Sequence, residues 1–235
     1  MIEVKDLYKT FGKVEVLKGL DLSIKKGGIF AVLGPNGSGK TTLIKCILGM
    51  VIPNKGIIEI NNESIIKKHQ YRNDIDYLPQ IANFPSNLSV TELIEMIKNL
   101  RPKSTYDTEL IKVFRLENFL DKKLGNLSGG TRQKVNLVLA FMFDSELVIL
   151  DEPTTGLDPI SLIKLKEIIN KEKQKGKTIL ITSHIMSFVE EVADEIVFLL
   201  DGKIYFKGTI KKLKEDTNQK NLEQAIATIL LKEDV

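Results

Sequence analysis

The 235-residue chain carries 34 lysine and arginine residues against 31 aspartate and glutamate residues, for a formal net charge of +3. This balance is too even to argue for a nucleic-acid-binding protein. A composition of 43% hydrophobic and 28% charged residues is typical of a soluble globular domain that buries a sizeable core. The single cysteine, Cys46, excludes an intramolecular disulfide and a cysteine-based metal site, and it fits a reducing compartment.

Neither a secretory signal nor a membrane span is expected. The first six residues lack the basic flank and the long apolar core of a signal peptide. No stretch of the sequence approaches the roughly 18 consecutive apolar residues that a membrane-spanning helix needs. We therefore expect a soluble protein of the cytoplasm.

Alternating apolar and polar side chains predict two antiparallel strands at 2–8 and 14–24, with Gly12 in the turn between them. Further strands are expected at 29–33, 57–60, 75–78, 147–150, 178–182, 196–200 and 204–206. Helices are expected at 40–49, 110–116, 131–143, 160–174 and 185–193. A capping-box pattern at 89–92 predicts one more helix before the apolar face of 93–100.

Strands that alternate with helices predict an α/β fold with a largely parallel sheet covered on both faces. We expect residues 1–81 and 144–208 to form the catalytic core of a single domain. Residues 82–143, where the pattern becomes helical, are expected to form an inserted lobe. A tail at 209–235 is expected to carry two short amphipathic helices.

Residues 34–42 match the phosphate-binding pattern G-x-x-x-x-G-K-[ST], between an apolar strand and a helix. The glycines let backbone N–H groups surround phosphate oxygens, and the helix points its positive end at them. Lys40 can reach the β- and γ-phosphates, and the Thr41 hydroxyl can bind Mg²⁺. The alternative, an ordinary glycine-rich turn, is disfavoured by this context. The predicted nucleotide-binding residues are Gly34, Asn36, Gly37, Ser38, Gly39, Lys40, Thr41 and Thr42.

Asp151 and Glu152 are further candidate residues of the same nucleotide site. They follow four aliphatic residues at 147–150, at the carboxyl end of a buried strand, where open α/β sheets bind ligands. Asp151 can hold the Mg²⁺ that bridges the β- and γ-phosphates. Glu152 can orient and deprotonate a water aligned with the γ-phosphorus, which makes it a candidate catalytic residue. The alternative is a plain surface Asp-Glu pair.

Ser128 and the glycines after it form a second candidate anion site, because they offer a hydroxyl and backbone N–H groups at a helix N-terminus. The segment 127–134, LSGGTRQK, resembles the LSGGQ signature of ATP-binding cassette (ABC) ATPases, the nucleotide-binding subunits of ABC transporters. The resemblance implies a P-loop NTPase fold with a RecA-like core, an N-terminal antiparallel β subdomain and an inserted α-helical lobe. It also implies a head-to-tail homodimer, with ATP between the phosphate loop of one subunit and Ser128 and Gly130 of the other.

Other motifs of the family occur in order. Gln80 matches the glutamine that touches the Mg²⁺ and water site, and Asp158 resembles the aspartate that crosses the dimer interface. His184 resembles the switch histidine that contacts the γ-phosphate, which adds it to Glu152 and Lys40 as a catalytic candidate. Its alternative is a structural or solvated histidine. Phe11 falls where the family places an aromatic ring on adenine, and its alternative is a half-buried residue at a strand end.

Two departures from the family pattern are Thr131, where glutamine is usual, and Lys134, where arginine is commoner. Neither removes Ser128 or Gly130, so neither weakens the expectation of ATP binding. The departures and the tail together resemble the exporter branch with the ABC-2 type of membrane subunit. A narrower resemblance is to the ATPase subunit that serves copper-site maturation of nitrous oxide reductase.

These observations predict an ATPase that uses ATP and Mg²⁺, pairs with a second copy and powers transmembrane permease subunits in separate chains. Its expected place is the cytoplasmic face of the inner membrane, as a peripheral protein without nucleic acid. The alternative is a soluble ABC ATPase that acts on DNA or ribosomes. DNA-type members carry a long coiled coil before the signature, and ribosome-acting members usually carry two cassettes, whereas this chain shows neither. A non-hydrolysing regulatory cassette is disfavoured by Glu152 and His184.

Overall fold

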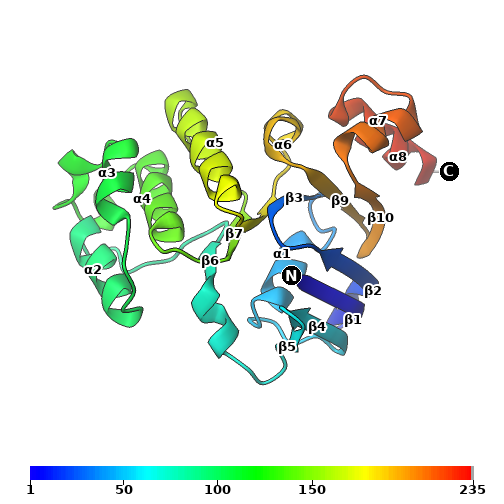
Figure 1. Ribbon diagram of the computed structural model, residues 1–235, viewed down its shortest axis with the longest axis horizontal. Coiled ribbons are helices and arrows are strands. Elements are labelled where there is room, and N and C mark those ends of the chain that lie inside the picture. The colour runs from blue at the N-terminus through cyan, green and yellow to red at the C-terminus, as the bar shows by residue number, and fades with distance from the viewer. Residues whose placement is uncertain (234–235) are drawn as a thin grey trace.

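The computed structural model describes residues 1–233, and it builds them around two β-sheets (Figure 1). The smaller sheet is antiparallel, with the strand order β2-β1-β4-β5. Gly12, with a φ of 59°, lies in the turn between its first two strands, as the sequence predicts. The strands of this sheet are β1 (Ile2–Phe11), β2 (Val14–Ile24), β4 (Lys55–Ile60) and β5 (Glu63–Ser64).

The larger sheet has the strand order β10-β9-β3-β8-β7-β6, and all its neighbours are parallel except the pair β10 and β9. Every strand of it was expected from its apolar run. The strands are β3 (Gly28–Leu33), β6 (Ile75–Leu78), β7 (Leu147–Asp151), β8 (Thr178–Thr182), β9 (Glu195–Leu200) and β10 (Lys203–Gly208).

The helices agree with the predicted ones, with shifts at their ends that have local causes. Ser89 and Glu92 form the predicted capping box. The helix expected at 110–116 begins earlier and ends before Arg115, which adopts a left-handed φ of 55°. The helices are α1 (Lys40–Ile47), α2 (Val90–Leu100), α3 (Asp107–Val113), α4 (Gly129–Phe141), α5 (Pro159–Gln174), α6 (Met186–Val192), α7 (Ile210–Thr217) and α8 (Leu222–Glu233).

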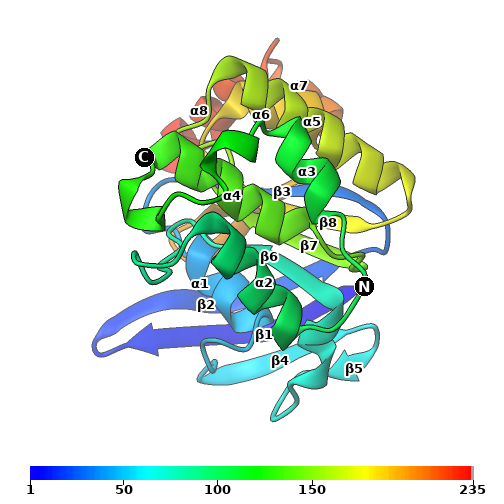
Figure 2. The same cartoon turned by 90° about the vertical axis from the view of Figure 1, so that its left-hand side faces the viewer.

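Two hydrophobic clusters cover the two faces of the larger sheet, as alternation along its strands requires. Along β3, Ile29 and Ala31 pack into the cluster that includes the helices α4, α5 and α6, whereas Phe30 and Val32 pack against α1 and the smaller sheet (Figures 1 and 2). Cys46 is buried in the second cluster, and burial raises the pKa of its thiol to about 11, as expected of a structural cysteine.

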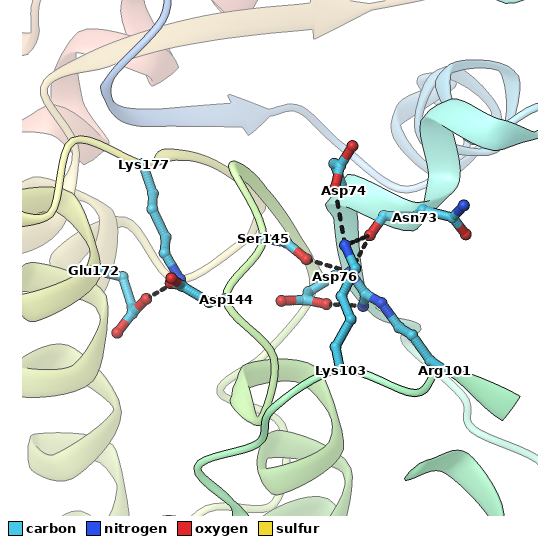
Figure 3. Close-up of polar contacts among 9 residues, drawn as sticks. All are labelled: Asn73, Asp74, Asp76, Arg101, Lys103, Asp144, Ser145, Glu172 and Lys177. Atoms are coloured by element: carbon cyan, nitrogen blue, oxygen red, sulfur yellow. Dashed lines mark hydrogen bonds and ion pairs between the residues drawn. The ribbon is translucent and has the colours of Figure 1, made fainter. Parts of the chain in front are cut away.

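α2, α3 and α4 form a helical layer on one side of the molecule, which faces the viewer in Figure 2. Arg101, directly after α2, ties this layer to the sheet (Figure 3). Its guanidinium lies 2.5 Å from Asp76 Oδ1 of β6 and 2.6 Å from the Ser145 hydroxyl before β7. The Asp76 side chain is only 2% exposed, and burial raises the pKa of its carboxyl although Arg101 opposes the shift.

A second buried ion pair lies beside the first in Figure 3. Lys177, directly before β8, contacts Glu172 of α5 at 2.5 Å and Asp144 at 2.8 Å. Burial alone would lower the pKa of Lys177, but the two carboxylates raise it above its ordinary value. The amino ends of β6, β7 and β8 are thus fixed by charge pairs. At the other end of the same strands lies the candidate site.

None of the helices in the described range 1–233 is both long enough and apolar enough to cross a membrane.

We expect Arg101→Ala to destabilise the protein by about 3–5 kcal/mol, because it leaves a carboxylate buried without its partner. The measurement is the free energy of unfolding in urea. The matched control is Lys103→Ala, which breaks an exposed ion pair with Asp74 in the same region and should cost less than about 1 kcal/mol. Equal effects of the two changes would show that the buried pair does not anchor the helical layer.

Candidate nucleotide site

The candidate site forms where four adjacent parallel strands end. In the sheet, β3, β8, β7 and β6 are consecutive neighbours, and the carboxyl ends of parallel strands lie at one edge. The phosphate loop follows β3, His184 follows β8, Asp151 ends β7 with Glu152 directly after it, and Gln80 follows β6. Residues more than a hundred positions apart in the sequence therefore converge.

The phosphate loop holds backbone conformations that require glycine at two positions. Gly34 has a φ of 152°, and a Cβ there would lie 2.0 Å from the Leu199 carbonyl oxygen. Gly39 has a φ of 105°, and a Cβ there would lie 2.9 Å from Leu17 Cδ2. The loop can therefore bring its backbone N–H groups close to a ligand, directly before the N-terminus of α1.

Lys40 is folded against its own loop. Its Nζ donates hydrogen bonds to the carbonyl oxygens of Gly34 at 2.7 Å and Pro35 at 2.9 Å. Burial lowers the pKa of this amine, while Glu152 and Asp151 oppose the shift. Two carbonyl oxygens thus accept the hydrogen bonds that the Lys40 amine could instead donate to phosphate oxygens.

Thr182, the last residue of β8, fixes both acidic residues of the neighbouring strand. Its hydroxyl donates to Asp151 Oδ1 and accepts the Glu152 backbone N–H at 3.0 Å, in a fully buried position. Asp151 Oδ2 is buried and has no hydrogen-bond partner among the described residues. An unpartnered carboxylate oxygen is costly unless a ligand binds it.

Glu152 adopts the left-handed backbone region, with a φ of 52°, although it is not a glycine. Such strain persists at functional sites, where surrounding contacts hold it in place. The residue is 6% exposed, and its Oε2 lies 2.8 Å from His184 Nδ1. The His184 side chain itself is 64% exposed, so its ring reaches outward from the buried carboxylate toward solvent.

A cleft of about 560 Å³ opens over these groups, which is within the range of small-ligand sites. It brings together most of the phosphate loop with Gln80, Asp151 and Glu152. The exposed Val14 and the half-buried Val16 of β2 also line it, and the sequence does not single them out because valines on a strand carry no specific pattern. The lining residues are Val14, Val16, Asn36, Gly37, Gly39, Lys40, Thr41, Thr42, Gln80, Asp151 and Glu152.

Phe11 does not line this cleft. It ends β1 with 49% of its surface exposed, and Lys9 Nζ lies 4.8 Å from the centre of its ring. Its predicted contact with adenine stays a prediction.

Thr41, Gln80 and Asp151 fit a Mg²⁺ ion. They offer a hydroxyl, an amide oxygen and a carboxylate in one cleft, and Asp151 Oδ2 lacks another partner within residues 1–233. Mg²⁺ prefers oxygen ligands and is usually held by one or two carboxylates together with phosphates and water. The described residues contain no cluster of three or more His, Cys, Asp and Glu side chains that could hold a metal ion.

The signature residues lie apart from the cleft. Ser128 caps α4 by accepting the Thr131 N–H at 3.2 Å, and its hydroxyl lies 2.8 Å from the Thr131 hydroxyl. A Cβ at Gly130 would lie 2.6 Å from the Gly156 carbonyl oxygen, so this glycine permits close packing of the segment before α5. Neither Ser128 nor Gly130 is among the described residues that line the cleft.

Asp158 joins the same packed region. Its carboxylate caps α5 through the Ser161 N–H at 2.8 Å and pairs with Lys134 Nζ at 2.7 Å. The pKa of the Asp158 carboxyl lies far below its ordinary value. The hydrogen bond from Lys134 has the largest effect on it, and the one from the Ser161 backbone N–H adds to that effect. The lysine that departs from the family pattern thus connects α4 to the segment before α5.

Comparison with known proteins places the chain. A sequence profile described as ABC transporter matches residues 17–155, more than half of the chain, and an AAA-domain profile matches 123–190. A lantibiotic transport ATP-binding protein of Streptococcus pyogenes is 34% identical, over 95% of both chains. The "Probable amino-acid import ATP-binding protein" of Bacillus subtilis is 31% identical, over 97% of both.

Solved structures agree with the sequence relatives. The structure of an ATP-binding subunit of an ABC transporter superposes with a TM-score of 0.89 at 31% identity, over 97% of this chain and 98% of that one. A dimeric ATP-binding cassette in a post-hydrolysis state, bound to ADP and Pi, gives a TM-score of 0.80 at 26% identity, over 89% and 99%.

We expect Thr182→Val to lower ATP turnover at least about tenfold, because the isosteric side chain no longer orients Asp151 and Glu152. The measurement is steady-state phosphate release. The control is Thr178→Val at the other end of β8, where the buried hydroxyl accepts the Gly27 N–H at 2.9 Å. Both changes should cost about 1–3 kcal/mol of stability. Equal loss of turnover in the two variants would contradict the role given to Thr182.

Three observations agree. The phosphate loop shares one cleft with Asp151 and Glu152, the signature segment lies at the N-terminus of α4, and the relatives match nearly the whole chain. The chain belongs to the ABC transporter family, as an ATP-binding and ATP-hydrolysing subunit.

Proposed function

We propose that two copies of this chain close head to tail around two ATP molecules and that hydrolysis reopens them. The observation that carries the proposal is the separation of the two anion sites. The cleft contains the phosphate loop and the acidic residues but not Ser128 or Gly130. A second copy would bring its Ser128 hydroxyl and the N-terminus of its α4 to the open side of the nucleotide.

In this proposal the phosphate loop binds the triphosphate. Lys40 exchanges its bonds to the Gly34 and Pro35 carbonyl oxygens for bonds to phosphate oxygens, and the loop glycines give backbone N–H groups. Thr41, Gln80 and Asp151 would hold Mg²⁺, which neutralises charge between the β- and γ-phosphates. Closure excludes bulk solvent and positions the reacting groups, including the attacking water. This positioning supplies most of the catalysis in phosphoryl transfer.

Glu152 serves as the catalytic base that orients the attacking water and accepts its proton. His184, 2.8 Å from the carboxylate, leaves Glu152 on closure and contacts the γ-phosphate. Loss of the γ-phosphate then removes the charge that holds the two copies together. The segment around Gln80 and the adjoining helical layer carry the movement outward.

The permease subunits would be separate chains, with this protein bound at the cytoplasmic face of the membrane. Export is the favoured direction, from the resemblance to the ABC-2 branch. A Nod factor export ATP-binding protein of Rhizobium meliloti, 35% identical over 88% of this chain and 64% of its own length, supports export, whereas the amino-acid import relative of Bacillus subtilis at 31% identity does not. The narrower resemblance to the ATPase of copper-site maturation stays a prediction.

A soluble ATPase that acts on DNA or ribosomes has no support in the comparisons. The segment between the phosphate loop and the signature holds helices of 11 and 7 residues, α2 and α3, which are far too short for a coiled-coil arm.

We expect Glu152→Gln to bind ATP with native affinity but to lose at least about 99% of turnover, because the amide cannot accept a proton. The variant should also accumulate as an ATP-bound dimer, measured by size-exclusion chromatography with light scattering. Glu146→Gln, at an exposed acid paired with Lys26, is the control and should behave as the native protein does. Undiminished hydrolysis by Glu152→Gln would exclude the proposed base.

We expect Asp151→Asn to raise the Mg²⁺ concentration for half-maximal ATPase activity at least about tenfold, because it removes the carboxylate charge from the ion. Titration of activity with Mg²⁺ in chelator-treated protein measures this. Asp201→Asn, at a surface pair with Lys18, should leave the titration unchanged. A native Mg²⁺ requirement in Asp151→Asn would place the metal ligand elsewhere.

A further inference from the structure

The helix α6 begins two residues after His184, and its position decides where the ring of that histidine lies. α6 has only seven residues, too few to be stable alone, so tertiary packing sets its position. Phe188 and Val189 of α6 are fully buried. α6 contacts α5 on one side and the tail helix α8 on the other (Figure 1).

The buried side of α6 packs in one cluster with residues of the tail. Leu213 of α7 and Leu222, Ala225 and Ile226 of α8 are buried in the same hydrophobic cluster as Phe188. Because α6 also contacts α8 directly, this shared burial of apolar side chains holds the short helix against the tail. The tail thus supports the helix behind His184.

Glu190 of α6 joins all three helices by its two carboxylate oxygens. Oε1 pairs with Lys214 Nζ of α7, and Oε2 accepts the backbone N–H of Leu222 at the start of α8, at 3.3 Å. The hydrogen bond from Lys214 lowers the pKa of Glu190 most. Burial opposes this shift, and the hydrogen bond from the Leu222 backbone adds to it. One carboxylate therefore connects both tail helices to the element that follows the switch histidine.

We propose that Glu190 is a positioning residue for His184, so that residues 209–233 of the tail take part in setting the rate of ATP hydrolysis. This inference rests on the proposed role of His184 in the reaction. The path runs by hydrogen bonds from Lys214 and Leu222 to Glu190, along the chain of α6 back to residue 184, and from His184 Nδ1 to Glu152 Oε2 at 2.8 Å. A shift of α6 would move His184 both in this contact and in its proposed contact with the γ-phosphate.

The experiment uses the full chain with His69→Gln, which leaves His184 as the only histidine. Nitrogen-15 NMR of the ring then reports His184 alone. Glu190→Ala should shift the His184 ring resonances and lower kcat about three- to tenfold, with the KM for ATP within twofold of native. Glu190→Gln keeps an acceptor for the Leu222 N–H and loses only the charge. Its ring shift and its kcat should therefore lie between those of the native protein and those of Glu190→Ala.

The matched control is Glu215→Gln on α7, where the acid pairs with Lys211 of its own helix at the surface. It should change neither the His184 resonances nor kcat. Native resonances and native kcat in Glu190→Ala would overturn the inference, and so would an equal effect in Glu215→Gln. A loss of kcat with unshifted His184 resonances would also overturn it. Failure here leaves the proposed function standing, because that depends on Glu152→Gln.

Should Glu190→Ala fail to fold, Lys214→Met separates the same contact from the opposite side and keeps an unbranched stem of similar length. The expected result is the same pattern of shifted His184 resonances and reduced kcat. Thermal unfolding of each variant shows whether a reduced rate reflects loss of folded protein, because unfolding lowers the apparent enzyme concentration without shifting the resonances of the folded fraction. Unshifted resonances in folded Lys214→Met would contradict the inference.

Discussion

The structure depends on the side-by-side pairing of four parallel strands, β3, β8, β7 and β6. Parallel pairing places the carboxyl ends of all four at one edge, and each end carries a chemically distinct group. The four strands are mostly apolar along their length, and the acidic residues that line the cleft lie at or directly after the carboxyl end of β7. Strand order therefore brings the phosphate loop, Gln80 and the two acidic residues of the cleft to one edge of the sheet.

The cross-strand contacts of Thr182 turn that edge into a defined site. They hold one oxygen of Asp151 and the backbone of Glu152, and the other oxygen of Asp151 has no hydrogen-bond partner among residues 1–233. Among the described residues, Ser128 does not line this cleft, whereas Lys40 and the two acidic residues do. In the proposed dimer, the second copy would bring its own Ser128 to the cleft.

Most of the fold could be predicted from the sequence, since apolar periodicity and capping residues are local patterns. The phosphate loop and the pair Asp151-Glu152 could also be found, because their glycines, lysine and carboxylates occur at fixed spacing beside apolar strands. The parts assigned to Thr182, Val16 and Glu190 could not be predicted from the sequence. Each acts through contacts with residues distant in the chain, such as Thr182 with Asp151 across 31 positions, and no local pattern records such a contact. Phe11 is not among the described residues that line the cleft, and its predicted contact with adenine stays a prediction, since a strand-end aromatic carries no directional information in the sequence.

The most direct test of the composite site is complementation between two inactive variants, Lys40→Ala and Ser128→Ala, purified apart and then mixed. A mixed dimer carries one site in which both the phosphate loop and the signature are native. Phosphate release should therefore rise on mixing to about a quarter of the native rate, since half of the dimers are mixed and each has one complete site of two. A mixture no more active than the average of its two components would contradict the claim that the site is built from two chains.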